Sequence, residues 1–110
     1  MHHYTHIAQL KTELLDNFLQ WRAEDLQNFM IKKYHPLLEG LRLFYSESNP
    51  IRKNLEYAYM HYLKDALYML KDGRYQKMDI YNNYIVRAAE LMEKAHAACH
   101  KLAEFFRSIE

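Results

Sequence analysis

The chain has 110 residues, and its 15 basic and 14 acidic side chains leave a formal net charge of +1. Half of the residues are hydrophobic, and only two glycines and two prolines occur, which excludes collagen-like, low-complexity and intrinsically disordered chains. So small a net charge offers no bulk field to a nucleic acid or an anionic membrane, and we expect neither as a partner. We expect a single domain over residues 1–110, because this length suffices for one hydrophobic core.

The start of the chain lacks the features of a signal peptide, because Lys11, Glu13 and Asp16 interrupt every apolar run. No stretch approaches the ~20 apolar residues of a membrane-spanning helix. The single cysteine, Cys99, excludes an internal disulfide and is compatible with a reducing compartment. We therefore expect a cytoplasmic protein.

The first predicted element is a long helix over residues 5–33, in which apolar side chains recur at helical spacing. Arg22 and Asp25 fall within the apolar arc, three residues apart, where we expect a local ion pair. His35-Pro36 predicts the end of this helix, because proline lacks a backbone N–H and clashes with the preceding turn. A short second helix is predicted over residues 36–46.

The third predicted helix spans residues 50–72. Asn49 is a favourable N-cap and Pro50 suits the first helical position, while Lys71 and Gly73 are typical of a helix end. At about 100° per residue, the inward stripe of this helix contains Leu55, Tyr59, Tyr62, Ala66 and Leu70.

The last predicted helix covers residues 75–108 and shows the clearest periodicity, with Cys99 on one flank as a half-buried apolar residue. Steps of four and three residues define a seam made of Tyr84, Ala88, Leu91, Ala95, Ala98, Leu102, Phe105 and Ile109. No segment alternates with the period of a strand. The expected fold class is therefore all-α, an up-down helical bundle of three long helices and one short helix.

The outward line of the third helix is the first candidate functional site. It consists of Tyr57, His61, Lys64 and Tyr68, whereas a solvated face usually carries Glu, Lys, Gln and Asp. A tyrosine-rich line indicates burial against something else, either the short helix of the same chain, another protein or a second copy. We expect these four residues to bind a partner.

The same helix supports a second hypothesis, phosphoryl relay. The run over residues 58–66 resembles the His-x-x-Lys-Gly motif of the histidine phosphotransfer family, which uses a helical bundle of similar length. The resemblance implies that His61 is the phosphoacceptor and Lys64 its charge partner, on an exposed helix face. Asp65 stands where the family has glycine, and its carboxylate would repel a phosphoryl group.

A third hypothesis is a metal-binding bundle, with His96, Cys99 and His100 as candidate ligands. Glu93 precedes His96 by three residues, and Glu-x-x-His resembles half of the di-iron pattern of ferritin-like bundles. A second Glu-x-x-His is lacking. In the seam register both histidines point outward, away from the space between helices where bundle cofactors lie. We therefore expect no metal and no cofactor.

No pattern in the chain is typical of catalysis. Its three serines lack a histidine at motif spacing, and no glycine-rich loop could cradle a phosphate. We therefore expect no catalytic residue. The leading hypothesis is a small non-enzymatic interaction module, an adaptor or regulator, that binds another protein or its own copy as a homodimer.

Overall fold

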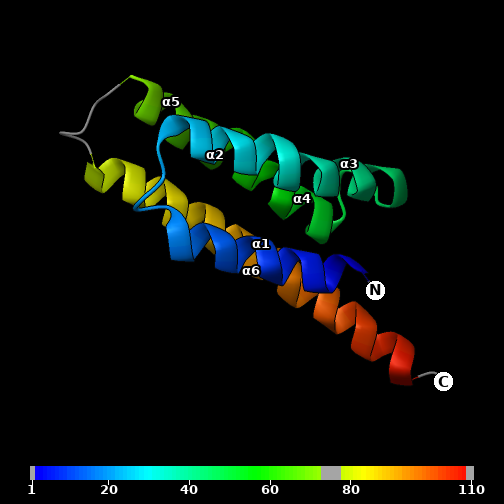
Figure 1. Ribbon diagram of the computed structural model, residues 1–110. Helices are drawn as coiled ribbons and strands as arrows, with labels where there is room; N and C mark the ends of the chain where they lie inside the picture. The colour runs from blue at the N-terminus through cyan, green and yellow to red at the C-terminus, as the bar shows by residue number, and fades with distance from the viewer. Residues whose placement is uncertain (1, 73–77, 109–110) are drawn as a thin grey trace.

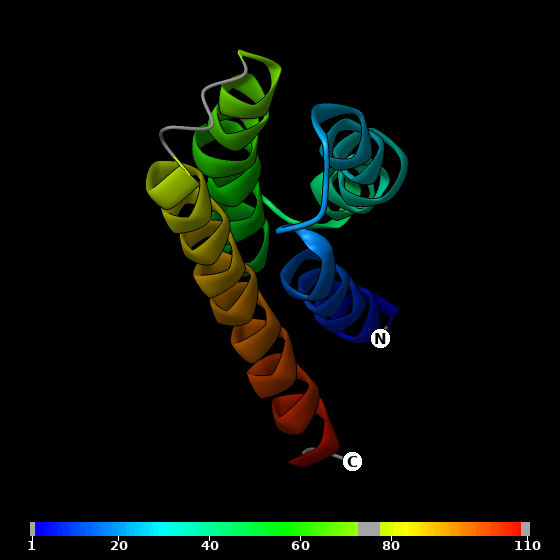
Figure 2. The same ribbon diagram turned by 60° about the vertical axis from the view of Figure 1, so that its left-hand side comes forward.

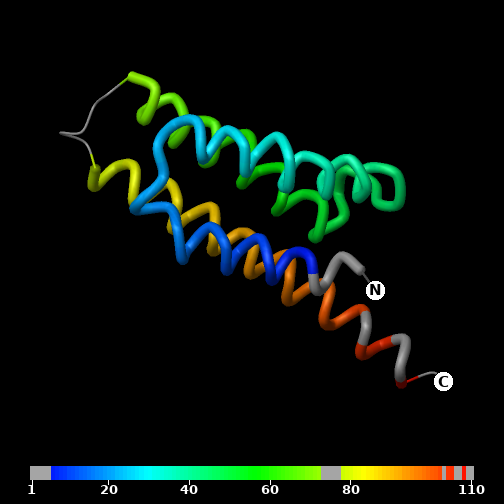
Figure 3. The backbone as a smooth tube through the Cα atoms, viewed as in Figure 1, coloured from blue at the N-terminus to red at the C-terminus, as the bar shows by residue number. Residues whose placement is uncertain are grey.

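The computed structural model describes residues 2–72 and 78–108 (Figure 1), and Figure 3 follows the same backbone as a tube. Over these two ranges all regular structure is helical and no strand occurs, which confirms the all-α prediction. The elements are α1 (His2–Asn17), α2 (Ala23–Phe29), the π-helix η1 (Met30–Tyr34), α3 (His35–Phe44), α4 (Pro50–Tyr57), the π-helix η2 (Ala58–Leu63), α5 (Lys64–Lys71) and α6 (Met78–Ser108).

The elements form four helical rods, because α2–η1–α3 and α4–η2–α5 are each continuous. Successive rods run in opposite directions (Figure 1). Helix α6 packs along α1 and along α4–η2, while α2 packs on α5 and α3 on α4. Seen from the side, α1 and α6 lie next to each other and the α2–α3 rod stands apart from α6 (Figure 2). In the described ranges, no helix is both long and apolar enough to span a membrane.

The prediction of one helix over residues 5–33 is wrong, because the chain leaves the helix after Asn17 and re-enters it at Ala23. The Asp25 carboxylate accepts a hydrogen bond from the backbone N–H of Arg22 at 3.0 Å. An acidic side chain at this position satisfies an N–H group that a helix start leaves without a partner. Asp25 thus caps α2 through the backbone of Arg22, in place of the ion pair expected with its guanidinium.

The predicted break at His35-Pro36 is also wrong, and with it the separate short helix over residues 36–46. The N–H of His35 donates to the carbonyl of Met30, five residues earlier. This wide π turn lies directly before Pro36, whose missing N–H and bulky ring would otherwise disturb the turn. The rod therefore continues through the proline to Phe44, and each of the other three rods is longer than α1, so the second rod is not the short helix that the sequence predicts.

The predicted start of the third helix is confirmed, because the Asn49 side chain accepts a hydrogen bond from the N–H of Ile51 at 2.9 Å. Helix α5 ends at Lys71. Gly73 and the predicted start of the last helix at residue 75 lie outside the described residues. The second π turn, η2, changes the helical register, because the buried side chains of this rod are Ile51, Leu55, Ala58, Leu63 and Ala66. The step of five between Ala58 and Leu63 displaces Tyr59 and Tyr62 to half-buried flanks.

Helix α6 supplies the centre of the core, but its seam is rotated from the predicted one. The buried side chains follow steps of four and three as Tyr81, Ile85, Ala88, Met92, Ala95 and Cys99. Cys99 is only 1% exposed, so it is more deeply buried than expected. Phe105, predicted in the seam, is 58% exposed, and Ile109 lies outside the described residues. Buried side chains from all four rods form one contiguous cluster.

The π-helices η1 and η2 meet in this cluster. The hydroxyl of Tyr34, at the end of η1, donates to the carbonyl of Leu55 at 2.7 Å. The Tyr34 ring stacks on Tyr59 of η2 with a centroid separation of 5.5 Å. The ring stack therefore joins η1 to η2, and the buried hydrogen bond joins η1 to the last turn of α4, directly before η2. π turns inserted in α-helices are frequent at functional sites, so the side chains around η2 are candidates for a functional site.

Candidate interaction surface

The four side chains predicted as the outward line are all exposed. Tyr57 is 47% and Tyr68 66% exposed, and His61 and Lys64 are exposed as well. The four residues nevertheless do not form one straight line along the rod, because η2 lies between Tyr57 and Tyr68. The i→i+5 turn of η2 differs from the α-helical spacing on which the prediction rests.

Two of the predicted residues belong to a continuous row of aromatic rings. Tyr57 lies against His61 with a centroid separation of 4.3 Å, and Tyr57 contacts Tyr62 at 5.8 Å. Tyr62 in turn contacts Tyr84 of α6 at 6.3 Å. We call these four rings the aromatic row. It crosses from α4–η2 to α6, and all its members are at least partly exposed.

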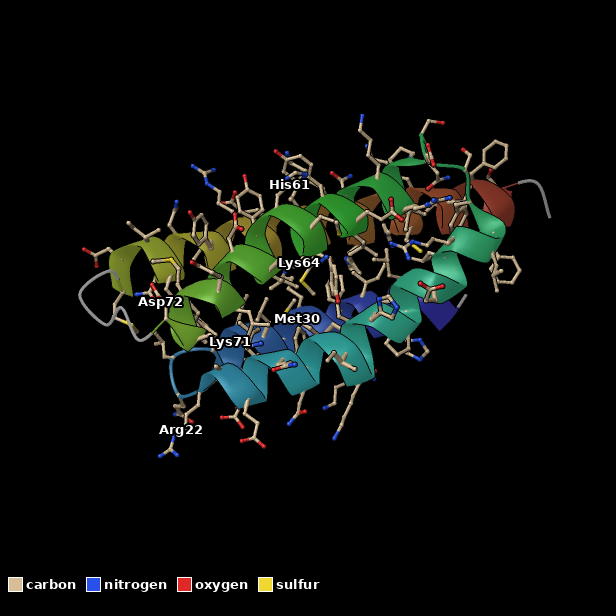
Figure 4. All side chains as sticks on the ribbon, turned by 90° about the horizontal axis from the view of Figure 1, so that it is seen from above. Arg22, Met30, His61, Lys64, Lys71 and Asp72 are labelled. Carbon is tan, nitrogen blue, oxygen red and sulfur yellow. The ribbon has the colours of Figure 1, made fainter. Side chains whose placement is uncertain are left out.

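Lys64 belongs to a different group of side chains. Its Nζ lies 5.4 Å from the centre of the Tyr59 ring, a cation–π contact on the side of the helix that faces η1. Figure 4 shows His61 and Lys64 leaving the rod on different sides, Lys64 toward the neighbouring helix that carries Met30. The structure therefore does not bring Lys64 beside His61 as the charge partner that the phosphotransfer resemblance implies. Tyr68 lies one turn beyond Lys64 on α5.

A shallow groove of about 230 Å³ borders the aromatic row at its α4 end. Met60 is 46% exposed and contributes an apolar side chain next to Tyr57 and His61. The groove is lined by Glu47, Lys53, Glu56, Tyr57, Met60 and His61. It thus combines an apolar end with a charged end.

The charged end of the groove is held by an ion-pair network between α3 and α4. Glu56 accepts hydrogen bonds from Nε of Arg42 at 2.6 Å and from Nε of Arg52 at 3.3 Å. Arg42 also donates to Glu39 at 2.7 Å, and Arg52 donates to the carbonyl of Tyr45 at 2.8 Å. The hydrogen bond from Arg42 is the main cause that lowers the pKa of Glu56 below its ordinary value. Glu56 is therefore a fixed anion beside the aromatic row.

The metal candidates of α6 are not assembled into one site. Burial raises the pKa of the Cys99 thiol, which disfavours the thiolate that a metal requires. Nε2 of His100 lies 2.9 Å from Glu104, and Nδ1 of His96 lies 3.9 Å from Glu93. Throughout residues 2–72 and 78–108, no group of three or more His, Cys, Asp or Glu side chains could hold a metal ion.

Sequence reasoning missed two members of the aromatic row, because it assigned Tyr62 and Tyr84 to the core. A usable signal was present, since a tyrosine at the edge of an apolar stripe can bury its ring and leave its hydroxyl in water. What periodicity alone could not supply was the π turn that sets Tyr62 beside Tyr57. Comparison with known proteins adds no further assignment, since no family, no curated protein and no solved structure gives a significant match to the chain.

Proposed function

We propose that this protein is a non-enzymatic interaction module that binds another protein through the aromatic row and the adjoining groove. The observation that carries the proposal is the contiguity of four partly exposed rings across two helices. Tyrosine is enriched in protein interfaces because it offers a large stiff ring with few rotatable bonds, together with a hydroxyl that can hydrogen-bond. The row supplies both over one surface.

The groove supports a protein partner in two ways. It is shallow, which suits an inserted side chain better than an enclosed small substrate. Its charged end carries both signs, with Glu47 and Lys53 in the lining and Glu56 paired with two arginines, so it favours a partner that presents polar side chains beside an apolar one. Lys64 and Tyr68 provide a secondary contact along α5 for a partner that extends past η2.

The proposal is tested by site-specific photo-crosslinking in the source cells. A photoreactive benzoylphenylalanine replaces Met60, which is 46% exposed beside the row, or Leu19, which is 65% exposed on the connection between α1 and α2. We expect a crosslinked protein specific to position 60. Adding Tyr57→Ala should remove that product without loss of helical circular dichroism, because Tyr57 is exposed.

The controls separate the predicted contact from unspecific capture. The same products from positions 60 and 19, or a product at position 60 that survives Tyr57→Ala with His61→Ala, would contradict the proposal. The single variants Lys64→Ala and Tyr68→Ala show whether the contact extends along α5. If Tyr57→Ala unfolds the protein, the row is part of the core and the proposed surface is wrong.

A further inference from the structure

A groove of about 550 Å³ lies between α1 and the antiparallel α2–η1–α3 rod, away from the aromatic row. It is more than twice as large as the groove beside that row. Cavities of roughly 300–1,000 Å³ are those in which proteins bind small molecules, and in helical bundles such sites lie between facing helices. The lining consists of His6, Gln9, Leu10, Glu13, Lys33, Pro36, Leu37 and Gly40.

The middle of the groove is apolar and one end is closed by an ion pair. Leu10 is only 8% exposed and Leu37 is half-buried against the core, so the fold holds both in place. Nζ of Lys33 lies 2.5 Å from Oε1 of Glu13 and joins the two walls. The lysine and the carboxylate of the lining therefore neutralise each other.

The other end of the groove carries hydrogen-bonding groups and a bare stretch of backbone. Because the two rods run antiparallel, His6 of α1 and Gly40 of α3 lie at the end opposite the ion pair. The amide of Gln9 both donates and accepts hydrogen bonds, as does a neutral imidazole. A polar group of a ligand can therefore be satisfied at this end without carrying a charge.

Gly40 keeps open a space that the packing of the chain does not require. A Cβ atom built on this glycine would meet nothing within 4 Å, so a larger residue would have room. A glycine inside a helix is less favourable than alanine, because it loses more conformational freedom on folding. What glycine does provide is a backbone that a ligand can approach closely.

We propose that this groove binds a small, uncharged, flat molecule of two or three fused apolar rings that carries one hydroxyl or amide group. The rings lie against Leu10 and Leu37 and over the backbone of Gly40, and the polar group reaches His6 or Gln9. A charged ligand is disfavoured, because its charge would be taken from water without a free partner of opposite sign. The aromatic row lies on other elements, so this inference stands or falls independently of the proposed function.

The pair 2-naphthol and 2-naphthoate tests the inference, because the two molecules share a ring system and differ in charge near neutral pH. We expect 2-naphthol to cause saturable shifts of the amide signals of Leu10, Leu37 and Gly40 in ¹H–¹⁵N NMR spectra. We expect 2-naphthoate to bind roughly tenfold more weakly or worse. Absence of saturable shifts, shifts centred on Tyr57 and His61 instead, or equal binding of the two molecules would overturn the inference.

Gly40→Leu tests the position of the ligand by filling the groove from the wall. It should weaken the binding of 2-naphthol by roughly tenfold or more, without lowering the melting temperature, because the side chain has room and leucine favours helix. Asn28→Leu is the matched control, since Asn28 is exposed on α2 outside the lining, and it should leave binding unchanged. Equal effects of the two substitutions would exclude this groove as the site.

Glu13→Gln tests the argument from charge. It removes the anionic partner of Lys33, so the groove gains an unpaired cation. The affinity for 2-naphthoate should therefore rise relative to that for 2-naphthol. An unchanged ratio of the two affinities would show that the ion pair does not set the charge of the ligand, and would overturn the assignment of an uncharged one.

Discussion

Tyr34→Phe tests the buried hydrogen bond between η1 and the last turn of α4. The substitution removes only the hydroxyl, which donates to the carbonyl of Leu55 at 2.7 Å from a side chain that is 1% exposed. The ring stays, and with it the stack on Tyr59 and the contact with Phe29. An intramolecular hydrogen bond of this kind contributes about 0.5–1.5 kcal/mol net. We therefore expect the free energy of unfolding to fall by about 1 kcal/mol, and the melting temperature by roughly 4 °C.

The assay is urea unfolding followed by both helical circular dichroism and Trp21 fluorescence, which agree if the transition is two-state. Tyr62→Phe is the matched control, because Tyr62 is half-buried and donates no hydrogen bond to another described residue. If Tyr34→Phe and Tyr62→Phe change the stability equally, the hydrogen bond to Leu55 adds nothing. If Tyr34→Phe costs more than about 3 kcal/mol, well beyond one hydrogen bond, the hydroxyl fixes the π geometry itself.

Three further predictions concern titration and chemistry. Glu56→Gln should lower the free energy of unfolding, measured by urea titration, by about 1 kcal/mol near neutral pH. Because the pKa of Glu56 is lowered in the native state, this difference should vanish as the pH falls through that pKa. Glu90→Gln, in an exposed ion pair, is the control and should have no measurable effect. Burial raises the pKa of Tyr34, and that of Tyr81 to about 12, so the unfolded chain releases these phenolic protons at lower pH than the folded chain. The free energy of unfolding should therefore decline above about pH 10, and less steeply in Tyr34→Phe. A free energy of unfolding that stays constant above about pH 10 would refute this prediction. Incubation with phosphoramidate should leave the intact mass unchanged, and a gain of one phosphoryl group that His61→Gln abolishes would instead favour phosphotransfer.

The all-α class and the connection between α3 and α4 can be predicted from local chemistry. Asn49 and Pro50 are a side-chain cap and a residue that needs no N–H, so their meaning does not depend on the rest of the fold. The first connection did not follow, because its decisive residue, Asp25, acts on the backbone of Arg22 three positions earlier. Arg22 is an unusual residue at that position, and the spacing of Arg22 and Asp25 alone predicts an ion pair.

The candidate surface could be predicted only as far as His61. Tyr57, at the end of α4, and His61, within η2, lie together as helical spacing predicts. Beyond it, Lys64 is found with Tyr59, since periodicity analysis assumes one constant turn throughout a helix. The tertiary contacts beside η2, the stack of Tyr59 on Tyr34 and the hydrogen bond from Tyr34 to Leu55, are absent from any local pattern.

The π turn η2 also bears on how this chain can change in length. Between Ala58 and Leu63 the buried positions are five apart, one more than an α-helical turn provides. Loss of one exposed residue in this stretch, such as Met60, would leave a spacing of four and keep the same side chains buried. A core helix normally tolerates no deletion, because every later residue rotates out of register. Here an extra residue is already stored within the turn, so this rod can lose one position through evolution or by design without losing its core.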